Sequence, residues 1–157
     1  MRLALYQPDI AQNTGTMMRT CACLDVDVDV IGPTEFNMSE RALRRSGLDY
    51  LEHVRLLRHA SWDEFQAWRM QNGHRLVLLT TKASVAYTGH RFQDRDIVMV
   101  GRESAGVPET VARASDVRLA IPMAPGLRSL NVAVAAGMVL GEAIRQSQQP
   151  AEQGLGA

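Results

Sequence analysis

Short apolar runs that are typical of β-strands alternate with helical patterns along the whole chain, and this alternation limits the fold more than any other feature. A helix between two strands carries the chain back across the sheet, so successive strands pair in parallel. We therefore predict a single-domain α/β fold with a parallel sheet. Strands are expected at 3–6, 26–31, 54–57, 76–80, 97–100 and 117–121, and helices at 14–24, 39–46, 61–72, 108–114 and 129–146.

Three of these segments carry more detailed signals. The runs 76–80 and 97–100 are apolar throughout, which predicts central strands covered on both faces. In the run 26–31, valine alternates with Asp27 and Asp29, which predicts an edge strand with one face in water.

The helix expected at 61–72 has clear boundaries. Ser61 and Glu64 form a capping box at its start, and Gly73 follows as a left-handed C-cap. These local signals fix this helix better than any other in the chain.

The composition is that of an ordinary globular domain, with 46% hydrophobic and 22% charged residues in a chain of 157. We assign residues 1–146 to one domain and expect 147–157, which lack apolar periodicity, to be a frayed tail. The longest apolar stretch, 132–140, is too short to cross a bilayer, and no signal-peptide pattern is present. We therefore expect a cytoplasmic protein that does not associate with membranes. The two cysteines and four histidines lack ligand spacing, so no metal is expected.

The charges of the chain cancel, with 17 basic and 17 acidic residues, but they are unevenly distributed. Residues 20–40 carry five acids and no base, whereas residues 41–59 carry five arginines against two acids. An arginine-rich segment of this kind is suited to nucleic-acid phosphates, through Arg41, Arg44 and Arg45. The alternative is that these arginines form a solvated helix face.

The loop after the first strand has neither the glycine pattern of a dinucleotide site nor a Walker motif. It leads instead into a helix start that holds Asn13, Thr14 and Gly15, with Arg19 about one turn further on. Free backbone N–H groups and a guanidinium there would suit a phosphate. The alternative is that Asn13 or Thr14 merely caps the helix and Arg19 is solvated.

Two later loops also carry unusual residues. In 101–108, two glycines flank Glu103, which predicts either a tight turn open to a ligand or a simple strand-to-helix turn. After the last strand, Ser129 is the expected N-cap of the final helix, and Asn131 is expected in its first turn, where a buried amide needs partners. In a parallel sheet the loops after 76–80, 97–100 and 117–121 share one edge, so we predict a cofactor pocket there.

Three motifs in these loops resemble those of the SPOUT class of RNA methyltransferases. The first is N-T-G followed by an arginine, at 13–15 and 19. The second is G-x-E-x-x-G-[LV]-P, at 101–108, and the third is I-P-M, a short loop and S-[LM]-N, at 121–131. Within the class, the short chain and the stretches 5–15, 41–50 and 79–82 resemble the ribose 2′-O-methyltransferases of the tRNA wobble nucleotide.

The resemblance implies methylation of the ribose of nucleotide 34, cytidine or modified uridine, in tRNA, with tRNA-Leu isoacceptors as expected substrates. S-adenosylmethionine would be the methyl donor and S-adenosylhomocysteine the product. The resemblance also implies a deep trefoil knot at the C-terminal end (the SPOUT fold) and a homodimer. Knotted chains are rare in general, and this class is one of the exceptions.

Site residues follow from the motif positions. The cofactor would be bound by Leu79, Gly101, Ile121, Ser129 and Leu130. The catalytic positions would be Arg19, Glu103 and Asn131. A guanidinium scarcely deprotonates in proteins, so we hypothesise that Arg19 clamps a phosphate and favours ionisation of the ribose hydroxyl, while the other two order the site.

The sequence departs from the family pattern at three positions. Arg102 stands where proline is common, and Gly141 and Ile144 stand where aromatic residues are common. RNA contacts and the dimer seam are therefore less well defined than the cofactor site. Two alternatives remain open: a methyltransferase for another tRNA or rRNA site, and a non-catalytic RNA-binding protein of the same fold. The missing phosphate loop disfavours a small nucleotide-dependent metabolic enzyme.

Overall fold

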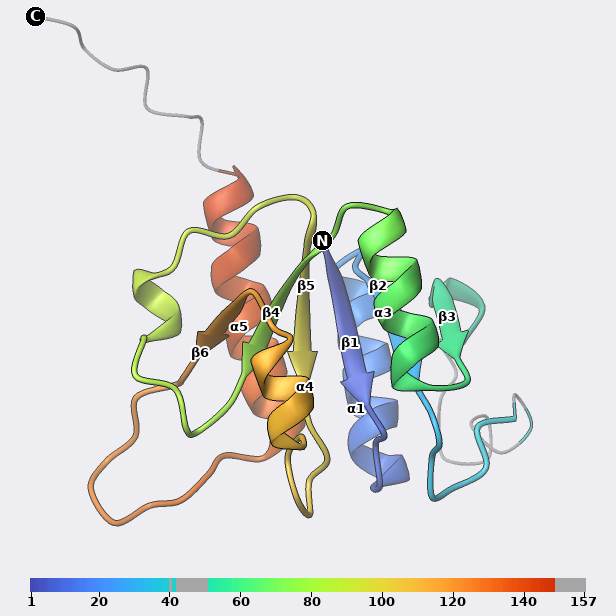
Figure 1. Cartoon of the computed structure of the whole chain (residues 1–157), viewed down its shortest axis with the longest axis horizontal. Coiled ribbons are helices and arrows are strands. Elements are labelled where there is room, and N and C mark those ends of the chain that lie inside the picture. Colours follow the sequence, from blue (N-terminus) through green and yellow to red (C-terminus); the bar gives the residue numbers. More distant parts are fainter. Residues whose placement is uncertain (40, 42–50, 149–157) are drawn as a thin grey trace, which may run out of the picture.

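Parallel strands in the order β3-β2-β1-β5-β4-β6 form one six-stranded sheet (Figure 1). The structure, a computed structural model, describes residues 1–39, 41 and 51–148 of the chain. The strands are β1 (Arg2–Tyr6), β2 (Asp27–Ile31), β3 (Leu56–His59), β4 (Arg75–Leu79), β5 (Asp96–Val100) and β6 (Val117–Leu119). The helices are α1 (Ala11–Cys23), α3 (Trp62–Gln71), α4 (Glu109–Arg113) and α5 (Val132–Gln148), with 3-10 turns at Leu51–His53 and Tyr87–Gly89. The parallel α/β fold is confirmed.

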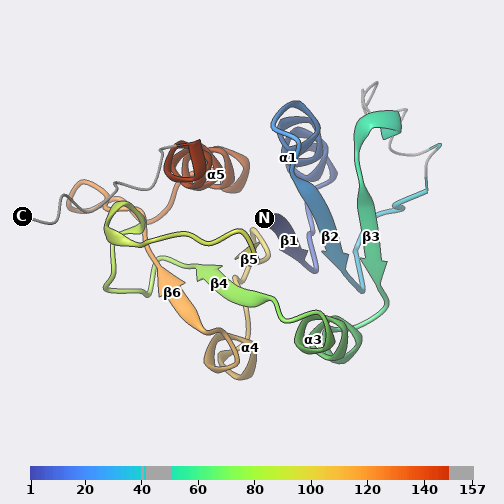
Figure 2. The ribbon, with the colours of Figure 1, turned by 90° about the horizontal axis from the view of Figure 1, so that it is seen from above.

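Helices cover both faces of the sheet, α1 and α5 on one side and α3 and α4 on the other (Figure 2). Alternate side chains of each strand therefore enter different cores. In β1, Leu3 and Leu5 pack beneath α1 and α5, while Ala4 and Tyr6 pack towards α3 and α4. Every residue of β5 is buried, as expected for a central strand.

The prediction that 26–31 forms an edge strand is wrong, because β2 lies between β1 and β3. Asp29 is fully buried and accepts a hydrogen bond of 2.6 Å from Nε of Arg2, and its other oxygen lies 2.8 Å from Nε2 of His59. Asp27 pairs with Arg2 and Arg55. The alternating aspartates thus mark ion pairs to the neighbouring strands and not a solvent-facing side.

Most predicted boundaries lie close to the observed ones, with two informative shifts here. The helix α1 begins at Ala11, three residues before its predicted start, and β3 lies two residues later than predicted. The Ser61 N-cap of α3 is confirmed, since Ser61 accepts the N–H of Glu64 at 3.2 Å, while the Glu64 carboxylate accepts the N–H of Ala60, one residue before the cap, at 3.0 Å. The helix predicted at 39–46 lies almost wholly outside the described residues.

At the C-terminal end, α5 continues through Gln148, two residues into the predicted tail, and 149–157 lie outside the described residues. Gln146 of this helix donates to the carbonyl of His90 and accepts the N–H of Phe92, both at 2.9 Å. The same β4–β5 connection pairs with the end of β6 through Ala86 and Ala120. These contacts hold the β4–β5 connection against the end of β6 and against α5, which is consistent with the knot. The knot itself stays a prediction.

Within the described ranges, no helix is long and apolar enough to cross a membrane. No group of three or more potential metal-ligating side chains occurs among the described residues. Cys21 is buried and Cys23 is exposed, both as free thiols, and burial raises the pKa of Cys21 to about 12.

The buried carboxylate of Asp29 yields a stability prediction. Asp29→Asn removes the charge that Arg2 and His59 share in the core, so the free energy of unfolding should fall by about 3 kcal/mol in urea denaturation. Asp25→Asn is the matched control, because Asp25 also pairs with an arginine, Arg55, but its side chain is 86% exposed. Its effect should stay below about 1 kcal/mol. Equal losses in the two variants would contradict the structural role given to Asp29.

Candidate functional site

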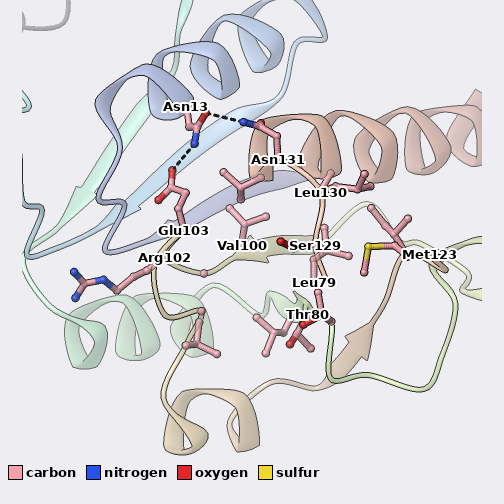
Figure 3. Close-up of a pocket in the computed structure, with 18 residues that line it drawn as sticks. Asn13, Leu79, Thr80, Val100, Arg102, Glu103, Met123, Ser129, Leu130 and Asn131 are labelled. Atoms are coloured by element: carbon pink, nitrogen blue, oxygen red, sulfur yellow. Dashed lines mark hydrogen bonds between the residues drawn. The ribbon is translucent and has the colours of Figure 1, made fainter. Parts of the chain in front are cut away.

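The loops that follow β4, β5 and β6 surround a cavity of about 320 Å³ at the carboxyl edge of the sheet (Figure 3). Parallel pairing in the order β5-β4-β6 brings these three loops together, as the sequence predicts. The lining residues are Asn13, Leu78, Leu79, Thr80, Thr81, Val100, Gly101, Arg102, Glu103, Gly106, Val107, Ile121, Met123, Ser129, Leu130, Asn131, Val132 and Ala135.

All five positions that the motifs assign to a cofactor lie on this cavity: Leu79, Gly101, Ile121, Ser129 and Leu130. Buried aliphatic side chains at the strand ends, including Leu78 and Val100, form part of its wall. A cavity of this size, lined by aliphatic side chains together with polar groups, suits a small organic molecule such as a nucleoside.

The turn after β5 depends on two glycines. Arg102 and Gly106 exchange backbone hydrogen bonds of 3.0 and 2.8 Å, and Gly106 has a φ of +66°. A Cβ at Gly101 would lie only 2.6 Å from the carbonyl carbon of Gly106. The predicted tight turn is confirmed, and glycine at 101 allows its two arms to approach each other.

A chain of polar side chains crosses the rim of the cavity (Figure 3). Asn131 donates to Oδ1 of Asn13 at 3.1 Å, and Asn13 donates to Oε1 of Glu103 at 3.2 Å. The backbone N–H of Asp9 donates to the other oxygen of Glu103 at 3.3 Å. Three segments that are far apart in sequence are thereby fixed to one another at the rim.

The helix caps differ from those predicted. The helix α5 begins at Val132, so Asn131 is its N-cap and not a first-turn residue: its Oδ1 accepts the N–H groups of Ala133 at 2.9 Å and Val134 at 3.3 Å. Ser129, the predicted cap, lies in the preceding loop on the cavity. A side chain two residues further upstream is too far from the helix start to cap it.

The start of α1 requires a similar correction. Neither Asn13 nor Thr14 caps this helix, because it begins earlier, at Ala11, after Ile10, and the cap position makes no side-chain hydrogen bond. Thr14 is buried and its hydroxyl donates to the carbonyl of Ile10 at 3.1 Å. Because Asn13 does not cap the helix, its side chain is available for the hydrogen bonds to Glu103 and Asn131.

Two carboxyl groups meet beside this polar chain. Asp9 accepts the N–H groups of Glu103 at 3.0 Å and Ser104 at 3.3 Å, and also the Ser104 hydroxyl. Its hydrogen bond with the Glu103 carboxyl, supported by Ser104, holds the pKa of Asp9 well below its usual range. Burial, together with the same contact, raises the pKa of Glu103. On acidification, Glu103 is therefore the member of the pair that takes up a proton first.

Arg19 does not line the cavity and its residue is exposed. It lies six residues after Asn13 on α1, which corresponds to about 9 Å along the helix axis and about 120° around it. Arg41 is exposed, while Arg44 and Arg45 lie outside the described residues. The structure therefore unites Glu103 and Asn131 with the cofactor positions, but it does not place Arg19 there.

Asp9 and Arg102 are site residues that sequence reasoning did not select. Asp9 meets Glu103 across 94 positions of sequence, so no local pattern could reveal the contact. In the sequence Arg102 stands out only as a departure from the family pattern, yet it lines the cavity.

Comparison with known proteins agrees with this geometry. The profile of the SpoU rRNA Methylase family matches residues 1–141. A tRNA (cytidine(34)-2'-O)-methyltransferase from Beijerinckia indica subsp. indica is 59% identical over 144 residues, which cover 92% of this chain and 90% of that protein.

Solved structures give the same result. One described as offering structural insights into the 2-OH methylation of C/U34 on tRNA has a TM-score of 0.86 and 38% identity, covering 94% of this chain and 91% of the other. An AdoMet-bound rRNA methyltransferase from Sinorhizobium meliloti has a TM-score of 0.83 and 27% identity, covering 94% of this chain and 57% of the other.

The position of the α5 cap can be tested by stability measurements. Asn131→Ala removes the acceptor of two helix N–H groups, so the free energy of unfolding should fall by about 1 kcal/mol. Ser129→Ala, the matched control two residues away, should change it by less than about 0.5 kcal/mol. Urea titration of both variants measures the difference, and a larger loss for Ser129→Ala would reverse the assignment.

Proposed function

The chain belongs to the SpoU rRNA methylase family, and on that basis we propose that it methylates the ribose 2′-hydroxyl of the wobble nucleotide, cytidine or modified uridine, in tRNA, with S-adenosylmethionine as donor. The observation that carries the proposal is the single cavity on which all five predicted cofactor positions meet, with Glu103 and Asn131 on its rim. The similarity to tRNA (cytidine(34)-2'-O)-methyltransferase supports nucleotide 34 as the target.

The cavity suits the donor chemically. The aliphatic side chains of Leu79, Ile121 and Leu130 would pack on the adenine ring, and the glycine turn at Gly101 keeps that wall free of a side chain. When bound, S-adenosylmethionine supplies an electrophilic methyl group on a positively charged sulfur and leaves as S-adenosylhomocysteine. Glu103 is the acidic residue among those that line the cavity, and its carboxylate would attract this charge.

The residues of the rim would order the reacting groups. The hydrogen bonds from Asn131 through Asn13 to Glu103 fix the start of α5, the helix α1 and the loop after β5 to one another, so the ribose hydroxyl would meet a site that is already formed. The remaining requirement is a cation that holds the neighbouring phosphate and stabilises the negative charge developing on the 2′-oxygen. We assign this role to Arg19, whose guanidinium suits a phosphate.

Arg19 would act on the cavity of a second copy of the chain. Four apolar residues are exposed just before α1, just before α5 or on α5: Ile10, Leu130, Val134 and Met138, which are 45%, 42%, 54% and 39% exposed. Both helices cover the same face of the sheet (Figure 2), and Gly137 and Gly141 leave open space on α5 for close approach. A homodimer formed through this face would bury the apolar residues and carry Arg19 of the partner subunit towards the cavity.

The proposal includes further RNA contacts and a compartment. Arg41, Arg44 and Arg45 would bind tRNA phosphates outside the cavity, since an arginine-rich segment suits the RNA backbone. The cytoplasm is the proposed compartment, because the proposed substrate is tRNA.

The reaction can be tested with purified protein, labelled S-adenosylmethionine and an unmodified tRNA-Leu transcript that has cytidine at position 34. We expect one 2′-O-methyl group per tRNA, located at nucleotide 34 by nuclease mapping. The matched control is the same tRNA with deoxycytidine at 34, which lacks the accepting hydroxyl and should remain unlabelled. Methylation at another tRNA or rRNA position, or binding of tRNA without transfer, would contradict the proposal.

The contribution of the second copy can be tested by mixing two inactive variants. Arg19→Ala removes the phosphate clamp, and Gly101→Ala forces a Cβ into the cavity turn, so each homodimer should be inactive. If Arg19 serves the partner's cavity, each heterodimer has one complete site, and random mixing should restore about a quarter of wild-type activity. Co-expression of the two variants, without selection of the heterodimer, and a transfer assay on the mixture measure this. A mixture that stays inactive, with both variants folded by circular dichroism, would place Arg19 in its own subunit's site, whereas an active Arg19→Ala homodimer would place it outside catalysis.

A further inference from the structure

We propose that Arg102 binds a phosphate of the substrate RNA, and that in the free protein Glu35 occupies the place which that phosphate takes. This inference rests on the proposed function, because it needs an RNA whose ribose enters the cavity beside Glu103. It assigns a substrate-binding role to a residue at which the chain departs from its family pattern.

The location of Arg102 is the first support. It directly follows Gly101 and lies on the cavity, next in sequence to Glu103. Its side chain projects from the turn after β5 away from the cavity and is 26% exposed (Figure 3). A ribose held at the rim has a phosphate on either side of it, so an outward-facing guanidinium at this point meets the backbone of the strand that enters the cavity.

The incomplete hydrogen bonding of Arg102 is the second support. A guanidinium carries five N–H donors, and among the described residues this one makes a single side-chain hydrogen bond, from Nη2 to Glu35. Its Nε lies 3.6 Å from a carboxylate oxygen of Asp9 and is the one buried side-chain nitrogen or oxygen atom without a hydrogen-bond partner in the described part of the chain. The Nη atoms of Arg102 thus carry N–H donors for which the described residues supply no acceptor beyond Glu35, and a phosphate would supply one.

The two acidic partners of Arg102 differ in how easily they can be exchanged. Asp9 is 7% exposed and already accepts the N–H groups of Glu103 and Ser104, so it is fixed. Glu35 is 64% exposed and reaches Arg102 from the loop after β2. An exposed ion pair contributes little, whereas a phosphate offers a guanidinium two parallel charge-assisted hydrogen bonds. A phosphate would therefore replace Glu35 and leave Asp9 in place.

A purely structural link between the two loops would have different consequences. If the ion pair served only to hold the loops, removing either partner would weaken RNA binding in the same direction. If a phosphate replaces Glu35, the two substitutions act in opposite directions, because Glu35 then competes with the RNA. The sign of the Glu35 effect separates these cases.

The experiment measures the Kd of the full-length protein for the tRNA-Leu transcript, with KM and kcat for methyl transfer, at several salt concentrations. Arg102→Ala should raise Kd and KM roughly tenfold with little change in kcat, and should reduce the salt slope of log Kd by about 0.7 to 1. Glu35→Gln should lower Kd about two- to fivefold. Arg102→Lys keeps the charge, so it should retain the salt slope while losing part of the affinity.

The matched control is the exposed ion pair of Arg113 and Glu109 on α4, whose nitrogen and oxygen are 3.0 Å apart. Arg113→Ala and Glu109→Gln should leave both Kd and the salt slope unchanged. A Glu35→Gln variant that binds tRNA more weakly than wild type, or an Arg102→Ala variant with an unchanged salt slope, would overturn the inference. Absence of transfer by the wild-type protein would instead overturn the proposed function, so the two failures are distinguishable.

Discussion

The parallel pairing of β1 with β5 is the constraint on which the rest of the site depends. Because these strands are neighbours, the loop after β1 and the loop after β5 meet at the carboxyl edge, and Asp9 contacts Glu103 across 94 positions of sequence. The chain leaves β1 for a helix on one face and β5 for a helix on the other (Figure 2). In open α/β sheets a crevice forms at such a point and commonly holds the ligand. Here the side chains of Asp9, Glu103 and Ser104 occupy it, and the cavity lies over the neighbouring strands β5, β4 and β6.

Polar groups of this protein connect segments that are distant in sequence. Asn131 caps α5 and also donates to Asn13 on α1, so one amide both starts the last helix and fixes the rim of the site. On the other half of the sheet, Asp29 joins Arg2 and His59 across three strands. Such buried charges add little net stability compared with apolar residues, but removing one partner leaves the others buried and uncompensated, which is costly. These three strands are therefore stable together only when all the charged partners are present.

Several sequence predictions succeeded because their signals are local. Hydrophobic periodicity located the strands β1, β2, β4 and β5 to within about one residue, and the Ser61 capping box located α3, because both depend on residues a few positions apart. The five cofactor positions came from motif resemblance, and they converge on one cavity because parallel strands end at the same edge. The edge-strand prediction for β2 failed, because alternating aspartates look the same in sequence whether water or an arginine faces them.

The sequence by itself determined the parallel α/β class, the central strands and the three loops that form the cavity, since periodicity and turn residues act over short distances. Only the tertiary structure decided which polar residues meet. It showed that Asn131 and not Ser129 caps α5, that Asp9 pairs with Glu103, and that Arg102 lies between Asp9 and Glu35. It also placed Arg19 outside its own chain's cavity. These contacts depend on strand order and helix phase, and both are properties of the packed sheet that no short stretch of sequence specifies.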